Sequence, residues 1–218
     1  MMSEFNSEVV KETLKEVVRI LETHNIEYRF LGSVVMASIN GGLHRNLGDL
    51  DLIVDGGKKN ILYKELEKLG YYPPGGMFAF GRNYLSLDTL ENPKLLGVGF
   101  FYGKWQTGGD FVIGNKDIKF TIESYALNKT KYVLEGITFI GVPRETAARG
   151  VINSRTNPKR KKELIIISGK GIKPYPNSYI HVELFGIKVD WIYQSIMHLL
   201  NIIGEVRVKS GMPFDPWR

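Results

Sequence analysis

The chain has 218 residues, of which 43% are hydrophobic, and this composition is ordinary for a globular protein with a sizeable core. It contains no cysteine, which excludes disulfides, thiolate zinc sites and a thiol nucleophile. The net charge of +6 favours an anionic partner, although a surplus of this size also suits an ordinary soluble surface. No apolar run has transmembrane length, and the first residues are polar and acidic rather than basic and then apolar. We therefore expect a soluble, cytoplasmic protein without a membrane partner.

The first 70 residues predict alternating helices and strands. Apolar residues recur at helical spacing in 7–24, short apolar runs mark strands, and Asn or Gly residues separate the elements. The expected order is helix, strand, helix, strand, helix, at 7–24, 28–31, 34–39, 49–54 and 58–69. This order is the opening of an α/β domain.

The remainder of the chain predicts a β-rich middle and a mixed C-terminal part. Short β-rich runs separated by turn residues occupy 77–80, 84–87, 95–102, 110–113, 118–122 and 137–141. A helix is predicted at 143–152, followed by a basic segment, a strand at 164–167, a glycine turn at 169–171, a strand at 180–185 and a helix at 190–203. We expect an α/β (α+β) fold with a mixed sheet flanked by helices over residues 1–150, and an α+β extension over 151–218 that completes a cleft.

A glycine-serine pair follows the first predicted strand. Gly32 allows a sharp bend and the close approach of a ligand, and a helix that begins at Gly32-Ser33 presents free amide groups to phosphate. Such a pair is also common in plain turns, so the phosphate interpretation depends on a second feature nearby.

That second feature is a pair of acids, Asp49 and Asp51, at the start of the second strand. The period of two along a strand points both carboxylates to one face and Leu50 and Leu52 to the other. Two acids on one face repel each other unless a cation lies between them. Carboxylate oxygens suit Mg²⁺ or Mn²⁺, whose coordination is completed by water and triphosphate oxygens.

The combination of Gly32-Ser33, a spacer, and Asp49-x-Asp51 before apolar residues resembles the signature of the polymerase-β nucleotidyltransferase superfamily. Arg45, four residues before Asp49, resembles the start of the R-x-T-x-D-x-D pattern of minimal and antitoxin-type nucleotidyltransferases, a group that includes antibiotic-modifying enzymes. The motif covers residues 28–55, with Leu47 where threonine is common. A weaker resemblance continues through the helix that begins after Pro143 to the basic segment.

The resemblance implies transfer of a nucleoside monophosphate from a nucleoside triphosphate to a hydroxyl group, with Mg²⁺ or Mn²⁺ as cofactor. Under it, Asp49 and Asp51 are catalytic residues and metal ligands. The residues implied for nucleotide binding are Gly32, Ser33, Arg45, Arg149 and Lys161.

A third carboxylate is expected in this superfamily on a later central strand. In this chain the corresponding strand, 96–101, carries glycine where an acid is expected. Asp110 is the preferred substitute as the third catalytic acid, and Asp117 is a second one. Without such an acid the site would bind nucleotide and metal but would transfer slowly or not at all.

The sequence therefore predicts an enzyme, a Mg²⁺-dependent nucleotidyltransferase, and leaves its acceptor open between a small molecule, a protein and an RNA. The alternative is a non-catalytic nucleotide- or RNA-binding regulatory module. A third possibility is an antitoxin-like protein that binds a partner. Neither the choice of nucleotide nor the oligomeric state follows from the sequence.

Overall fold

The computed structural model describes residues 5–74, 87–175 and 179–210. Within these ranges one mixed sheet of ten strands runs in the order β10-β9-β6-β5-β4-β2-β1-β8-β7, with β3 paired to β4. The strands are β1 (Tyr28–Phe30), β2 (Asp49–Asp55), β3 (Leu87–Leu90), β4 (Gly97–Trp105), β5 (Phe111–Gly114), β6 (Ile118–Ile122), β7 (Thr130–Leu134), β8 (Ile137–Gly141), β9 (Ile180–Leu184) and β10 (Ile187–Lys188). The predicted mixed sheet is confirmed.

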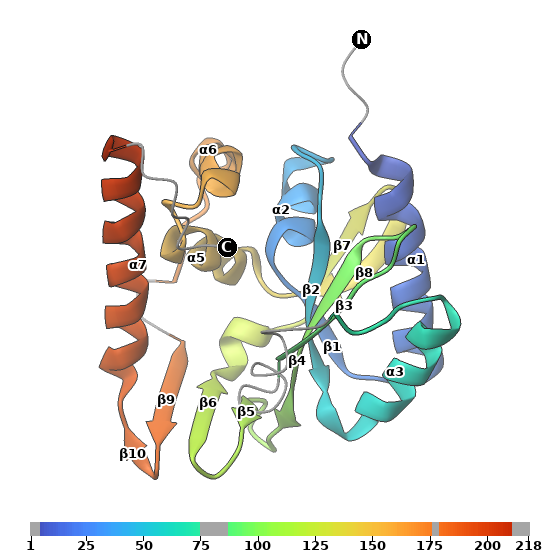
Figure 1. The fold of residues 1–218 in the computed structure, drawn as a ribbon, viewed down its shortest axis with the longest axis horizontal. Coiled ribbons are helices and arrows are strands. Elements are labelled where there is room, and N and C mark those ends of the chain that lie inside the picture. The colour runs from blue at the N-terminus through green and yellow to red at the C-terminus, as the bar shows by residue number, and fades with distance from the viewer. Residues whose placement is uncertain (1–4, 75–86, 176–178, 211–218) are drawn as a thin grey trace.

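Helices flank this sheet in two groups (Figure 1). α1 and α3 lie together on one side of the central strands, and α2, α5, α6 and α7 lie on the other. Their bounds are α1 (Ser7–Thr23), α2 (Gly32–Asn40), α3 (Lys59–Lys68), α5 (Arg144–Asn153), α6 (Lys161–Gly169) and α7 (Asp190–Ser210). Among the described helices, none is long and apolar enough to cross a membrane.

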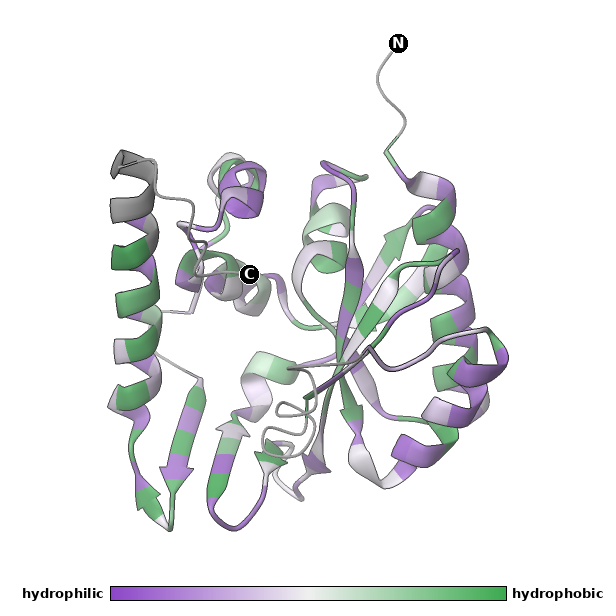
Figure 2. Cartoon of the chain, in the orientation of Figure 1, coloured by the Kyte–Doolittle hydropathy of each residue, from purple (hydrophilic) through white to green (hydrophobic). Residues whose placement is uncertain are grey.

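The amphipathic pattern of the first helix is confirmed. Apolar residues on one side of α1, among them Val10, Leu14 and Val17, are fully buried, while the opposite side is charged (Figure 2). A spacing of three or four residues places these side chains on one face, which packs toward the sheet and α3. The central strand β2 buries Leu50, Leu52 and Val54 completely.

Two parallel pairings place the predicted motif at the centre of the sheet. β2 pairs in parallel with β4, and β1 pairs in parallel with β8. β1 and β2 are joined to each other by an antiparallel pairing. The backbone N–H of Leu31 donates to the carbonyl of Asp51 at 2.8 Å, so the end of β1 and the start of α2 lie beside the acidic part of β2.

The predicted strand at 164–167 is wrong, because this segment lies within helix α6. Its run of Leu and Ile residues suits a strand locally, but here only one side of it packs inward. Glu163 and Ile167 are buried one turn apart, whereas Ile165 is 71% exposed. The chain turns into this helix at Asn157, whose side chain accepts from the N–H of Lys159.

Other differences concern boundaries and short strands. The predicted glycine turn at 169–171 starts at the last residue of α6 and continues as a turn over 170–171, and the last helix continues to Ser210. Strands β7 and β10 were not predicted, and the strand expected at 77–80 and most of that at 84–87 lie outside the described residues. The proposed domain boundary after residue 150 falls inside α5, and β9 extends the same sheet by pairing with β6. The division into two domains remains a prediction.

Candidate active site

Gly32 begins helix α2, with Leu31 between it and the end of strand β1, as the glycine-serine pair predicts. Its φ of +60° lies in the left-handed region, which favours glycine. A Cβ at this position would lie 3.2 Å from Oδ2 of Asp51. The start of α2, with its free amide groups, therefore lies against the carboxylate of Asp51.

Asp49 and Asp51 lie on one face of β2, two residues apart. Their parallel neighbours in β4 are Gly97 and Gly99. Burial and then the negative charge of Asp49 raise the pKa of Asp51 to about 6, against the opposing effect of Arg160 and Arg45. The exposed carboxylate of Asp49 thus repels the half-buried carboxylate of Asp51.

This donor set fits a hard divalent cation. Carboxylate oxygens are the ligands that Mg²⁺ and Mn²⁺ take from proteins, and these ions complete their coordination with water and phosphate oxygens. A cation between Asp49 and Asp51 would remove the repulsion that raises the pKa of Asp51. Asp49 and Asp51 are therefore the residues that could hold the metal.

Ser33, the second residue of α2, is contacted by two arginines from distant parts of the chain. Nη2 of Arg45 donates a hydrogen bond to its Oγ, and Nη1 of Arg160 donates to the same atom at 3.4 Å. Arg45 precedes β2, and Arg160 ends the short helix η3 (Pro158–Arg160) before α6. Two guanidinium groups consequently flank the N-terminus of α2.

Glu163 holds these two arginines in place. Its Oε1 lies 3.2 Å from Nη2 of Arg45, and its Oε2 accepts from Nη1 of Arg160 at 2.7 Å. Oε1 also lies 3.4 Å from Nε2 of His44. Burial raises the pKa of Glu163, but the hydrogen bond with His44 and the charges of Arg160 and Arg45 outweigh it and hold the pKa at about 2. Glu163 is fully buried and ionised, and so fixes the cationic groups around Ser33.

The structure places the two other predicted nucleotide-binding residues away from this network. Lys161 is exposed at the start of α6 and has no hydrogen-bond or ion-pair partner among the described residues. Arg149 lines a polar cavity of about 510 Å³ between α5, β9 and α7, and its buried Nε has no hydrogen-bond partner in the part of the chain that the structure describes. Their part in nucleotide binding remains a prediction.

Sequence reasoning singled out Lys161 rather than Arg160 within the basic segment 159–162, and it missed Glu163. The available signal was a single acid, Glu163, directly after four basic residues and three residues from Arg160, which is the spacing of neighbours on a helix. The strand assigned to 164–167 hid this signal, because only a helix turns Arg160 and Glu163 to the same side.

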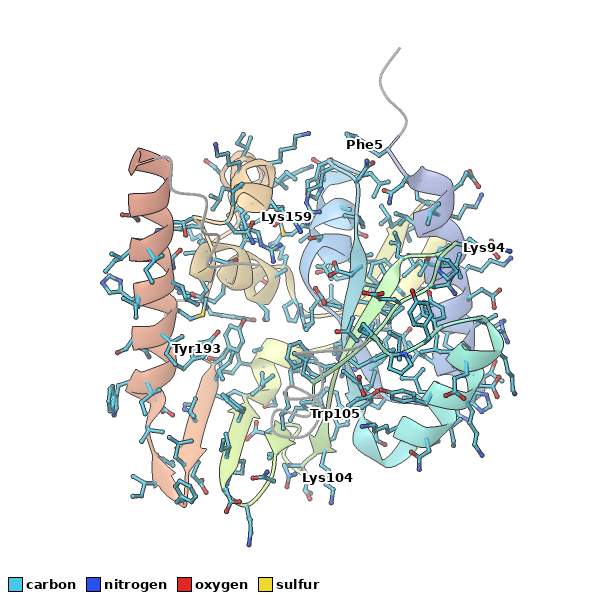
Figure 3. All side chains as sticks on the ribbon, in the orientation of Figure 1. Phe5, Lys94, Lys104, Trp105, Lys159 and Tyr193 are labelled. Carbon is cyan, nitrogen blue, oxygen red and sulfur yellow. The ribbon has the colours of Figure 1, made fainter. Side chains whose placement is uncertain are left out.

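The structure does not bring Asp110 to the acid pair. Asp110 lies between β4 and β5, beyond Trp105, and its Oδ1 accepts from the N–H of Ser124 at 2.8 Å. Trp105 ends β4 six residues beyond Gly99, about 20 Å away along the strand. Figure 3 shows Trp105 far from helix α2.

Asp117 lies in the turn between β5 and β6. Across 5–74, 87–175 and 179–210, no group of three or more His, Asp or Glu side chains could hold a metal ion. Neither Asp110 nor Asp117 is grouped with Asp49 and Asp51 among the described residues, and the part of either as a third acid remains a prediction.

No protein-family model matches the chain, and no curated protein matches its sequence. Among solved structures, 17 chains match. One is the lincosamide antibiotic adenylyltransferase LnuA with lincomycin bound, with a TM-score of 0.56 and 15% identity over 72% of this chain and 96% of that one. Another is the antibiotic-resistance factor ANT(2'')-Ia in solution, with a TM-score of 0.57 and 11% identity over 94% of this chain and 96% of that one.

These likenesses show that the chain has the nucleotidyltransferase fold. The resemblance to the polymerase-β nucleotidyltransferase superfamily, inferred from the motif over residues 28–55, is confirmed at the level of the fold.

Proposed function

We propose that the protein transfers a nucleoside monophosphate from a nucleoside triphosphate to a hydroxyl group. One observation carries this proposal: the carboxylate of Asp51, paired with Asp49, lies against Gly32 at the N-terminus of α2. A helix N-terminus binds phosphate, and a carboxylate pair binds the cation that accompanies triphosphate. The fold, shared with an antibiotic adenylyltransferase and an antibiotic-resistance factor, supports the same reaction.

In this proposal the chain's own residues bind and orient the triphosphate. The backbone amides of Gly32 and Ser33 hold the terminal phosphates, and Arg45 and Arg160 neutralise their charge. Asp49 and Asp51 would hold Mg²⁺ or Mn²⁺, which when bound supplies positive charge at the reacting phosphate.

The acceptor oxygen forms a bond to the α-phosphorus, and the bond to the bridging oxygen breaks. Pyrophosphate leaves with the electron pair, and the hydroxyl proton passes to water.

A second candidate function is nucleotide binding without transfer, as in a regulatory module. It is favoured by the two glycines, Gly97 and Gly99, that lie opposite Asp49 and Asp51 where a third acid is expected. Such a site keeps the means of binding triphosphate and cation, but no third acid is grouped with Asp49 and Asp51 among the described residues.

Two measurements on the same protein separate these functions. Equilibrium binding of each nucleoside triphosphate is measured with Mg²⁺ present, and transfer is followed as pyrophosphate release and as label from an α-³²P-labelled triphosphate passing to a cell extract. The variants are Asp49→Asn and Asp51→Asn. Asp55→Asn is the matched control, because Asp55 lies on the same strand about 13 Å from Asp51 and Asn can keep its hydrogen bond from Gly57.

The expected result is binding and transfer by the wild type and by Asp55→Asn, with transfer reduced at least 100-fold in Asp49→Asn and Asp51→Asn. Binding without transfer by the wild type would establish the second candidate. Absence of triphosphate binding would refute both.

A further inference from the structure

An apolar cavity lies on the face of the sheet to which Asp51 points, and its nearest lining residue on β2 is Ile53. On β2, Ile53 lies on the same face as Asp51, and its parallel neighbour on β4 is Phe101, just as Gly99 is the neighbour of Asp51. The row continues through Ile113 on β5 and Phe120 on β6, which are paired with each other. These four side chains line a cavity of about 280 Å³.

Residues from four further segments close this cavity on the side away from the sheet. Leu127 ends the short helix η2 (Ser124–Leu127), Thr146 comes from α5, Tyr179 precedes β9, and Tyr193 comes from α7. Figure 3 shows the Tyr193 side chain pointing from α7 toward the sheet. The volume is close to the lower end of the range for small-molecule sites, so the cavity suits a small ligand or one arm of a larger one.

The cavity offers no charged partner to its contents, because none of the described residues that line it carries a charge. Its polar groups are already engaged: Oγ1 of Thr146 donates to the carbonyl of Ala126 at 2.8 Å, and the hydroxyl of Tyr179 lies 3.5 Å from the carbonyl of Thr146. A cationic or anionic group buried here would lose its hydration without compensation. The lining therefore selects an uncharged, largely apolar occupant.

The same cavity lies beside the phosphate-binding end of α2. Leu31, which lines it, directly precedes Gly32, and Ile53 is only about 7 Å along the strand from Asp51. A smaller cavity of about 150 Å³ shares Leu31, Thr146 and Tyr179 with it and is lined also by Gly32 and Arg160. An occupant of the apolar cavity would therefore present one end to the reaction site.

From this arrangement we infer that the acceptor is a small, uncharged compound with an apolar body and a hydroxyl group, whose body fills this cavity while the hydroxyl faces Asp51. The inference rests on the proposed function for the transfer step and on the cavity for the class of acceptor. It excludes polycationic acceptors, which would need acids in the lining, and RNA, whose phosphates and ribose cannot enter an uncharged cavity of this size.

A pair of matched probes tests the inference. The neutral alcohol 3-phenylpropan-1-ol and its charged analogue 2-amino-3-phenylpropan-1-ol differ by one ammonium group. The affinity of the protein for each alcohol is measured by calorimetry without nucleotide or metal. The affinities for tobramycin and for a short RNA oligonucleotide are measured in the same way for comparison. Transfer to each compound is then measured with Mg²⁺ and the four nucleoside triphosphates.

Two variants fill the cavity from opposite sides, Phe120→Trp from the sheet and Tyr193→Trp from α7. The matched control is Phe185→Trp, because Phe185 is 77% exposed at the end of the β9–β10 hairpin. Thermal unfolding identifies which variants are folded, and only those are compared.

We expect the neutral alcohol to bind at least tenfold more tightly than its charged analogue, and each folded cavity variant to weaken this binding at least tenfold. Phe185→Trp should bind as the wild type does. Equal or tighter binding of the charged analogue, tobramycin or RNA overturns the inference, as does unchanged binding of the alcohol in a folded cavity variant.

The two proposals fail separately. Binding of the alcohol without any transfer upholds the apolar site and contradicts the proposed reaction, whereas transfer to tobramycin or RNA alone upholds the reaction and contradicts this acceptor class.

Discussion

Asp51 and Gly99 lie directly opposite each other in the parallel pair β2–β4, and a Cβ on residue 99 would lie 2.9 Å from Oδ1 of Asp51. Any side chain at position 99 would therefore displace the Asp51 carboxylate. The glycine that occupies the position expected for a third acid is the residue that gives Asp51 its place between β4 and α2.

Replacement of Gly99 should disturb the acid pair without unfolding the protein. The atom that a new Cβ would meet is the end of a flexible side chain, so in Gly99→Ala the Asp51 carboxylate rotates away while the backbone keeps its place. We expect binding of Mn²⁺ in the presence of ATP to weaken roughly tenfold, as for other changes beside a metal ligand. Calorimetric titration with Mn²⁺ measures this change.

Gly97→Ala is the matched control, because the nearest atom to its new Cβ would be the carbonyl oxygen of Leu90 at an ordinary 3.5 Å. It should bind Mn²⁺ like the wild type. Equal Mn²⁺ affinity in Gly99→Ala and Gly97→Ala would contradict the part assigned to Gly99.

Loss of the Glu163 charge should destabilise the fold. Glu163→Gln removes the buried anion between Arg45 and Arg160 and leaves both cations without their countercharge. Removing one partner of a buried ion pair costs about 3 kcal/mol of unfolding free energy. Urea unfolding at pH 7 measures this loss.

The comparison for Glu163→Gln is Glu205→Gln, whose ion pair with Arg155 is exposed on both sides. An exposed pair contributes less than about 1 kcal/mol, so this variant should unfold close to the wild type. Similar losses of unfolding free energy in Glu163→Gln and Glu205→Gln would show that the burial of Glu163 adds nothing to the stability of the fold.

Low pH should remove the stabilisation that the ionised carboxylate of Glu163 gives to the fold. The pKa of Glu163 lies at about 2 in the folded protein, below its ordinary value of 4.5. An acid with a lowered pKa stabilises the fold above its unfolded pKa, and this stabilisation is lost as the pH falls from 4.5 toward 2. The wild type should lose roughly 3 kcal/mol more than Glu163→Gln over this range, seen by urea unfolding at successive pH values. Parallel pH profiles would be inconsistent with an ionised, buried Glu163.

The acid pair and the glycine-serine pair could be predicted because their geometry is local. Strand alternation alone places Asp49 and Asp51 on one face, and the start of α2 at Gly32 follows from the end of a short strand two residues earlier. Within residues 28–55 the sequence contains the information that determines this part of the site.

The arginine network could not be predicted in this way, because its contacts join residues far apart in the chain. Arg45 and Glu163 are separated by 118 positions, and Ser33 and Arg160 by 127. Packing against α2 and α5 makes the Leu and Ile run of α6 helical, against its local preference for a strand. The placement of Asp110 could not be predicted for a similar reason, since it follows from the pairing of β4 with β5, which leaves Asp110 in the connection after Trp105.

Nucleotide binding should depend more on Arg160 than on its neighbour Lys161. Arg160 reaches Oγ of Ser33 at 3.4 Å and is oriented by Glu163 at 2.7 Å, whereas Lys161 is exposed and can act only through long-range charge. We expect Arg160→Ala to weaken ATP binding about tenfold or more, and Lys161→Ala to weaken it about twofold at low salt.

Lys170→Ala, at the other end of α6, provides the charge-matched control and should bind ATP as the wild type does. The ATP affinities of the three variants are measured by calorimetry at two salt concentrations. The loss of affinity in Lys161→Ala should vanish at high salt, whereas the loss in Arg160→Ala should persist. A larger loss in Lys161→Ala than in Arg160→Ala would place the triphosphate on the exposed side of α6, away from Ser33.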